Sequence, residues 1–195
     1  RYSGVKFKTL HKISNLIGER QYRAAARLID QTLITEPGVN WRRDLNKLSV
    51  FLRDPARKTF SPILAQGNGK LPFLAFSVLP GVTCPGAGDC LDWCYSFKAW
   101  RYPASFARQA QNTVLIQSKP ARIFDAFDKY NTGEPVTFRL YVDGDFDSVE
   151  TVNRWFNFLA ANPWLIAYGY SKSFNQLLLA IDAPKNYIFN ISGGH

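Results

Sequence analysis

The sequence predicts an α/β fold: a mostly parallel sheet with crossover helices, arranged like part of a barrel and preceded by a basic helical N-terminal region. Two observations favour it. Four short runs rich in apolar and β-branched residues recur in the last two thirds of the chain, with helical patterns between them; strands that alternate with helices in this way pair in parallel. The first third shows helical spacing and most of the positive charge. We therefore expect a basic helical region over residues 1–66 and an α/β domain over residues 67–195.

The N-terminal region predicts two helices with apolar inner faces and basic outer faces. Apolar residues recur at three- and four-residue spacing from His11 to about Leu33, and Pro37-Gly38 ends that pattern. A second helix is expected from Trp41 to Leu52, with Asn40 as its N-cap. Together the two helices are expected to form a helical hairpin.

The remaining elements alternate between strands and helices. Strands are expected over residues 71–79, 136–142, 165–170 and 187–191, and helices over 105–116, 121–130, 147–161 and 174–180. Asp147-Ser148-Val149-Glu150 fits a capping box with Asp147 as the N-cap of its helix. In a parallel sheet, the loops after the strands meet at one edge, and function gathers there.

The positive charge is concentrated at the N-terminus. Residues 1–60 hold thirteen Lys and Arg against five acids, a net charge of +8 out of +9 for the whole chain. This asymmetry predicts a polyanionic partner, nucleic acid first and DNA rather than RNA; the alternative is a solvated helical surface. The expected contacts are Arg20, Arg23, Arg27, Arg42, Arg43, Lys47, Arg53, Arg57 and Lys58, joined by Lys98 and Arg101, which alternate with aromatic residues.

The composition narrows the class of protein. Hydrophobic residues make up 46% of the chain, enough for a packed core. No apolar run reaches the roughly 18 residues that span a bilayer, so no membrane partner is expected. Three grouped cysteines favour a reducing compartment, the cytoplasm. The chain has no Met, from which we expect a fragment or a processed form.

Cys84, Cys90 and Cys94 lie within eleven residues, in a segment rich in Pro and Gly. Thiolates grouped in a tight loop are typical of a metal or iron–sulfur site. We expect them to hold zinc or a [4Fe–4S] cluster, with His195 as a candidate further ligand. The alternatives are one disulfide with a spare thiol, or three buried or free thiols.

Two other strand-end loops carry candidate catalytic residues. Asp143 and Asp145 flank Gly144 after the second strand, and alternating carboxylates on a turn are suitable ligands for Mg²⁺. Lys172 follows the third strand and is a candidate contact for phosphate or carboxylate. Equally simple interpretations are that the aspartates form a turn and that the lysine is solvated.

The runs Leu79-Pro80, Thr83–Ala87, Cys90, Cys94-Tyr95 and Arg101–Pro103, followed by Gly144–Phe146 and Tyr170–Ser173, resemble the phage "gene product 88" family. The resemblance covers roughly residues 70–195. It implies a phage or mobile-element origin, such as a plasmid, and carries no established activity.

A strand that leads into a three-cysteine loop is also similar to the radical S-adenosylmethionine superfamily. That resemblance implies that three thiolates hold a [4Fe–4S] cluster and that Asp143–Asp145 stands for the superfamily's Gly-rich acidic motif. Gly144 and Tyr95, the aromatic residue after the last cysteine, would then lie beside the cofactor. The spacing here is Cys-x5-Cys-x3-Cys, wider than the usual x3 and x2.

These observations predict a phage or mobile-element protein that binds nucleic acid and carries a three-cysteine metal site, acting in the cytoplasm of the host cell. One alternative is an enzyme, either a metal-dependent nuclease that uses Asp143 and Asp145 or a radical-type iron–sulfur enzyme. Another is a host-directed inhibitor or interaction module that docks through its charge.

Overall fold

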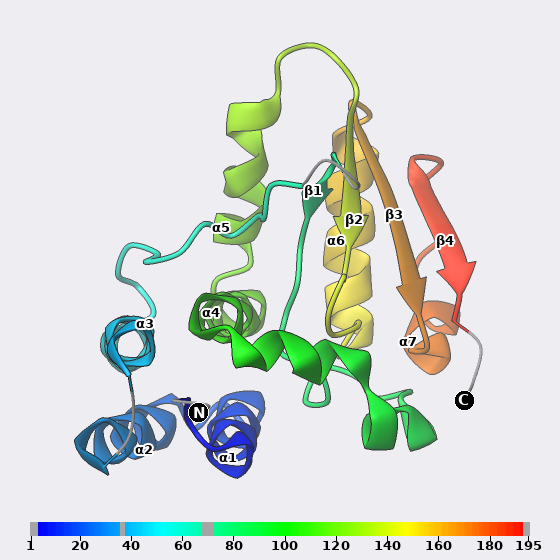
Figure 1. Ribbon diagram of the computed structural model, residues 1–195. Coiled ribbons are helices and arrows are strands. Elements are labelled where there is room, and N and C mark those ends of the chain that lie inside the picture. The colour runs from blue at the N-terminus through cyan, green and yellow to red at the C-terminus, as the bar shows by residue number, and fades with distance from the viewer. Residues whose placement is uncertain (1–3, 36–37, 68–71, 193–195) are drawn as a thin grey trace.

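The computed structural model describes residues 4–35, 38–67 and 72–192 (Figure 1). Four parallel strands pair in chain order: β1 (Leu74–Ala75), β2 (Val136–Leu140), β3 (Leu165–Ser171) and β4 (Tyr187–Ile191). Helices connect the strands, and three further helices precede them. The prediction of a parallel α/β sheet with crossover helices and a helical N-terminal region is confirmed.

The first strand is much shorter than the predicted 71–79, of which Leu71 lies outside the described residues. Beyond Ala75 the pairing continues irregularly: the Phe76 amide donates to the Arg139 carbonyl, and the Val78 amide donates to the Asp143 carbonyl. The irregularity has a cause directly after β2, where Tyr141 has a φ of +55° and turns the chain out of the extended conformation. The backbone is therefore bent where the strands reach the sheet edge.

The N-terminal region contains three helices: α1 (Phe7–Gly18), α2 (Tyr22–Thr35) and α3 (Val39–Arg53). The prediction of one helix from His11 to Leu33 is wrong, because the chain turns at Arg20, which has a φ of +60°. Apolar spacing continues across this break, so periodicity alone did not reveal it. The predicted N-cap is also wrong: α3 begins at Val39, and its N-cap is Gly38 rather than Asn40.

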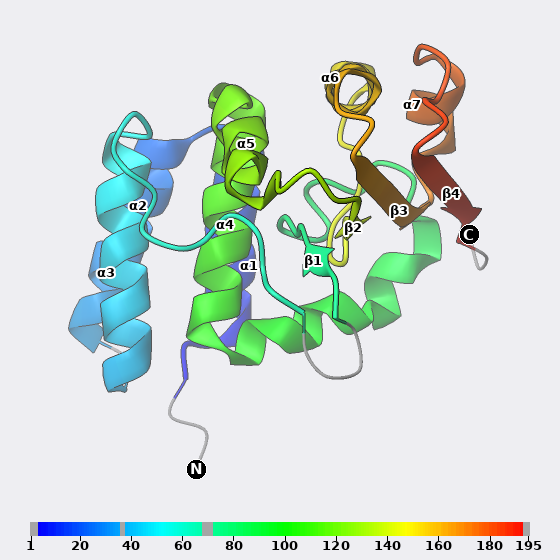
Figure 2. The same ribbon diagram turned by 90° about the horizontal axis from the view of Figure 1, so that it is seen from above.

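Helix α4 (Pro103–Ser118) lies at the centre of the molecule (Figure 2). One side of it contacts α1 and α3, and other residues of the helix face the segment after β1. Almost every residue from 106 to 116 is therefore buried. The amide nitrogens of two buried side chains are paired: Asn112 donates to the carbonyls of Ile63 and Ser77, and Gln111 donates to the carbonyl of Ser61. The Asn112 Oδ1 is buried without a hydrogen-bond partner among the described residues. Helix α4 thus joins the basic helices to the sheet part in one continuous core.

The other helices line the outer side of the sheet, which curves as it does in part of a barrel (Figure 2). They are α5 (Ala121–Phe124), the 3₁₀ helix η3 (Asp125–Tyr130), α6 (Val149–Ala161) and α7 (Phe174–Leu178). The N-cap of α6 is Ser148, whose hydroxyl accepts from the Thr151 amide at 3.2 Å. Asp147, predicted as the cap, instead accepts from the Thr151 hydroxyl at 2.6 Å.

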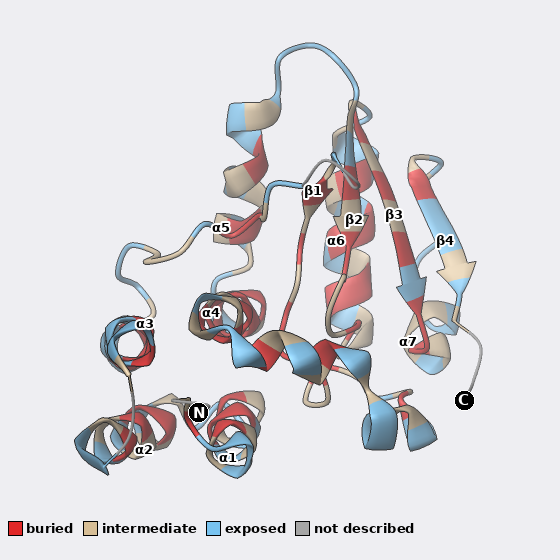
Figure 3. Ribbon diagram, in the orientation of Figure 1, coloured by how far each residue is buried: buried red, intermediate tan, exposed pale blue. Residues whose placement is uncertain are grey.

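The segment after β1 is not an open loop. It forms two 3₁₀ helices, η1 (Gly88–Trp93) and η2 (Tyr95–Arg101), which lie below the carboxyl ends of the strands (Figure 1). Burial is greatest along α4, and α3, α6 and the strands β1 to β3 also carry buried residues, whereas much of edge strand β4 is exposed (Figure 3). Among the described residues, no helix is both long enough and apolar enough to cross a bilayer.

Candidate functional sites

The segments that follow the four strands converge on one cavity of about 100 Å³ at the carboxyl edge of the sheet. The predicted site residues that line it are Cys84, Cys90, Cys94, Tyr95, Gly144, Asp145 and Lys172. Ser192, which follows β4, completes the set of four strand ends. The structure therefore brings the predicted sheet-edge residues together, and this cavity is the first candidate site.

The three cysteines are half-buried free thiols. Burial raises the pKa of the Cys84 thiol to about 12, so this group is protonated at neutral pH. In the described ranges, no three His, Cys, Asp or Glu side chains are grouped so that they could hold a metal ion. The thiols thus share a cavity without forming a ligand set, and zinc or a cluster there stays a prediction. His195, the other predicted ligand, lies outside the described residues.

Asp145 fixes the loop after β2 to the loop after β3. One of its oxygens accepts from the Ser171 hydroxyl at 2.6 Å and from the Phe146 amide at 2.8 Å, and the other accepts from the Lys172 amide at 2.8 Å. Burial raises the pKa of this carboxyl, and the hydrogen bonds oppose that effect. Through these three hydrogen bonds Asp145 positions the sheet edge; a catalytic role stays a prediction.

Two glycines allow the loops to pack this closely. An alanine Cβ at Gly86 would lie 1.9 Å from the Lys172 carbonyl oxygen, so the cysteine segment rests directly on the backbone after β3. Gly144 has a φ of +80°, and a Cβ there would lie 2.3 Å from a methyl carbon of Val78. Gly144 is therefore required for the turn itself, whether or not a cofactor lies beside it.

Asp143 faces α4 rather than Asp145's partners. One of its carboxylate oxygens accepts from the Gln109 side chain at 2.9 Å, and Gln109 in turn accepts from the Trp100 indole at 2.8 Å. Burial raises the pKa of Asp143 as well. This chain of hydrogen bonds connects η2, α4 and the end of β2, which is a structural role that the sequence did not indicate.

Aromatic residues of the cysteine segment contact residues that line the cavity. The Lys172 ammonium lies 5.5 Å from the centre of the Trp93 ring, a cation–π distance. The Tyr95 hydroxyl donates to the Val142 carbonyl at 3.1 Å and fixes η2 to the end of β2. Lys172 is nearly buried, so the interpretation of a solvated loop lysine is wrong.

Sequence reasoning missed Arg139, which lies in β2 and lines the same cavity. Its guanidinium carbon is 5.5 Å from the centre of the Tyr170 ring, and its Nε is buried without a hydrogen-bond partner among the described residues. The signal was present: Arg139 is a single cation between the buried residues Phe138 and Leu140. Alternation along β2 therefore places Arg139 on the inner side of the curved sheet.

The predicted nucleic-acid contacts are all exposed, and most lie on α2, α3 and the segment that follows α3. Arg23 and Arg27 share one face of α2 because they are four residues apart, and Arg43 and Lys47 share one face of α3 for the same reason. Among the described residues, ion pairs with carboxylates are made by Arg43 with Asp44, Arg53 with Asp30 and Arg57 with Asp54. Lys98 and Arg101 lie apart, on η2.

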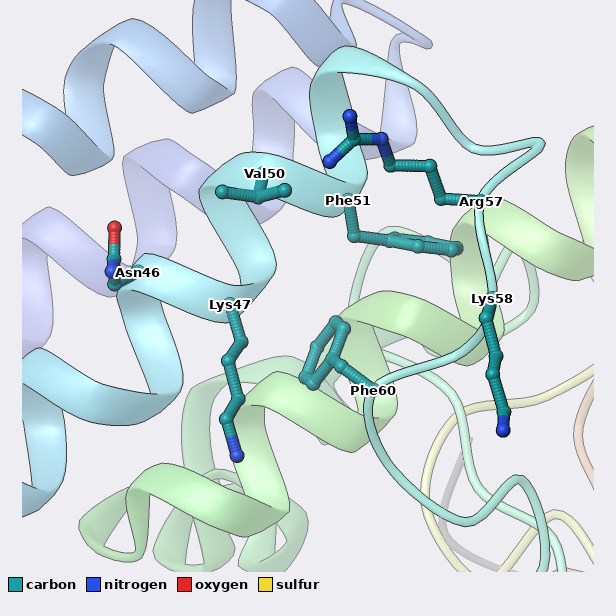
Figure 4. Close-up of a pocket in the computed structure, with 7 residues that line it drawn as sticks. All are labelled: Asn46, Lys47, Val50, Phe51, Arg57, Lys58 and Phe60. Atoms are coloured by element: carbon teal, nitrogen blue, oxygen red, sulfur yellow. The ribbon is translucent and has the colours of Figure 1, made fainter.

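A groove of about 420 Å³ runs between α3 and residues 57–60 (Figure 4). It is lined by Asn46, Lys47, Val50, Phe51, Arg57, Lys58 and Phe60. Figure 4 shows the rings of Phe51 and Phe60 in the space between the helix and the loop, with the Lys47 side chain alongside. The groove combines three cations with an apolar floor and is the second candidate site.

Comparison with known proteins gives one match. The model of the family described as Gene product 88 matches residues 48–195, which include the whole sheet, the cysteine segment and the last turns of α3. No curated protein and no solved structure matches the chain.

Proposed function

The chain belongs to the phage Gene product 88 family, and from this premise we propose that it binds nucleic acid through its N-terminal helices, in the cytoplasm of a host cell. One observation supports the proposal above all others. Every predicted cation of α2, α3 and the following segment is exposed, in a region whose net charge is +8.

The physical reason is the density of phosphate charge on nucleic acid. Cations that contact phosphates release condensed counterions, and this release supplies most of the affinity that does not depend on sequence. The acids of residues 1–60, those in the described ion pairs included, are outnumbered by cations, so the local field stays positive. We propose DNA rather than RNA as the polymer.

The test is a charge reversal on α2. Changing both Arg23 and Arg27 to Glu removes two exposed cations from one helix face and adds two acids. We expect the affinity for a labelled DNA duplex, measured by fluorescence anisotropy near physiological salt, to fall about 10- to 100-fold.

The matched control is the double change of Lys129 and Lys185 to Glu, which alters the net charge equally on the sheet part of the chain. It is expected to weaken binding far less, because screening limits charge effects to about 8 Å at this salt concentration. Equal losses in both double variants would show that only the total charge matters.

The cysteine cavity supports a second candidate function. We propose that Cys84, Cys90 and Cys94 hold zinc or an iron–sulfur cluster, since three thiols line one cavity at the carboxyl edge of a parallel sheet. A metal would require η1 to close toward Cys84 and the Cys84 thiol to lose its proton. Gly144 and Tyr95 would border the bound group.

Elemental analysis of protein purified without oxygen tests this second proposal. We expect stoichiometric zinc, or iron with sulfide, and its loss when Cys90 is changed to Ser. Protein that is folded, binds no added metal and has three titratable thiols would remove the proposal.

A further inference from the structure

We infer that the groove between α3 and residues 57–60 binds an unstacked base, so that the protein prefers single-stranded to double-stranded nucleic acid. This inference rests on the proposed function and adds to it the form of the polymer and the place where a base is recognised. It concerns a site separate from the cysteine cavity.

The floor of the groove is apolar and aromatic. The rings of Phe51 and Phe60 lie 5.7 Å apart at 70°, an edge-to-face pair. Phe51 is buried, Phe60 is partly buried against the core, and Val50 is 42% exposed. The part of Phe60 that lines the groove is thus held in place by Phe51, as a stacking platform requires.

The rim of the groove is cationic. Lys47 approaches from α3, and Arg57 and Lys58 come from the opposite loop (Figure 4). No acid is among the described residues that line the groove, although Asp54 lies 3.6 Å from the Arg57 guanidinium. Cations on both sides of an aromatic floor match a strand that places a base inward and its flanking phosphates outward.

The shape of the groove favours a single strand. Its volume of about 420 Å³ is within the range of small-ligand pockets, roughly 300–1,000 Å³. In a duplex, each base is stacked and paired, and its extrusion costs a few kcal/mol. A single strand can fill the groove without that cost, whereas duplex DNA contacts only the rim.

The groove also lies largely in the part of the chain shared with the family. Val50, Phe51, Arg57, Lys58 and Phe60 fall within the matched residues 48–195, and Lys47 directly precedes them. Most cations of α2 and α3 precede the match.

The experiment compares three probes of equal length: a single-stranded oligonucleotide, the same strand with abasic sites, and the corresponding duplex. Abasic strands keep the phosphates but lack the bases. We expect wild-type protein to bind the intact strand about tenfold more tightly than the abasic strand or the duplex, the size expected for stacking of one base.

Two variants separate stacking from charge. Phe60→Leu keeps an apolar side chain against Phe51 and is expected to remove most of the preference for bases, while abasic binding is unchanged. Lys58→Ala is expected to lower the affinity for all three probes by the same factor. Thermal denaturation of each variant confirms that it is folded.

The outcomes distinguish the two proposals. If the protein binds all three probes with equal affinity, or if Phe60→Leu keeps the full preference for bases, the inference is overturned while nucleic-acid binding stands. If the protein binds none of the probes, the proposed function and this inference both fail.

Discussion

Replacing Gly86 by alanine lowers the free energy of unfolding by about 3 kcal/mol or more, the largest effect that we expect from a single methyl group in this protein. The added Cβ would lie 1.9 Å from the Lys172 carbonyl oxygen and 3.2 Å from the Ser173 amide nitrogen. Both atoms belong to the backbone, so no flexible side chain can move aside. The cysteine segment must instead separate from the end of β3. For a chain of this length, the melting temperature should fall by roughly 6–12 °C.

Gly88→Ala is the matched control, since it places the same substitution in the same segment. Gly88 has a φ of +49°, and a Cβ there would meet no atom within 4 Å. Its cost is the backbone strain alone, about 1 kcal/mol. If urea denaturation shows that Gly86→Ala is no more destabilising than Gly88→Ala, the close packing of the two loops is wrong.

Asp145→Ala is expected to lower the free energy of unfolding by about 3 kcal/mol. The change leaves three donors at the sheet edge without their acceptor: the Phe146 and Lys172 amides and the Ser171 hydroxyl. A buried polar group that loses its partner costs about 1–3 kcal/mol. Removing the buried carboxylate offsets part of this loss of stability, because burial disfavours the charged form of the carboxylate.

Asp147→Ala controls for the loss of a carboxylate in the same loop. Asp147 accepts one described hydrogen bond, from the Thr151 hydroxyl, and is only half-buried. We expect Asp147→Ala to lower the free energy of unfolding by about 1 kcal/mol. Equal effects of the two substitutions, measured by chemical denaturation, would contradict the structural role of Asp145.

The pH dependence of stability gives a second readout for Asp145. Burial raises its pKa above the ordinary aspartate value, so on raising the pH the unfolded chain loses this proton before the folded chain does. Ionisation of Asp145 therefore makes the folded protein less stable as the pH rises from the ordinary aspartate pKa through the raised pKa of Asp145. Asp145→Ala is expected to remove that part of the slope. An unchanged slope would show that the carboxyl is not perturbed.

The sequence predicts the sheet well because its signals are local. Runs such as 136–142 and 187–191 combine β-branched and aromatic residues, and the helices between them leave parallel pairing as the simple solution. Convergence of the strand-end loops follows from that topology. Asp145 and Lys172 could therefore be placed at one edge before their contacts were known.

Features that depend on tertiary packing could not be predicted in this way. The turn at Arg20 interrupts a regular apolar pattern, and no Gly or Pro marks the residue with positive φ. The pairing of Gly86 with the Lys172 carbonyl joins segments more than 80 residues apart in sequence. The groove likewise needs Phe60 to fold back on α3, which no local pattern indicates.

The salt dependence of DNA binding by the wild-type protein tests the central claim most directly. If the exposed cations of α2, α3 and residues 54–58 neutralise four or five phosphates, the logarithm of the association constant should fall with that of the salt concentration with a slope of roughly −4. Arg23→Glu with Arg27→Glu should make the slope shallower by about 2. Binding that is independent of salt, or no binding at low salt, would contradict the claim that the basic helices recognise nucleic acid.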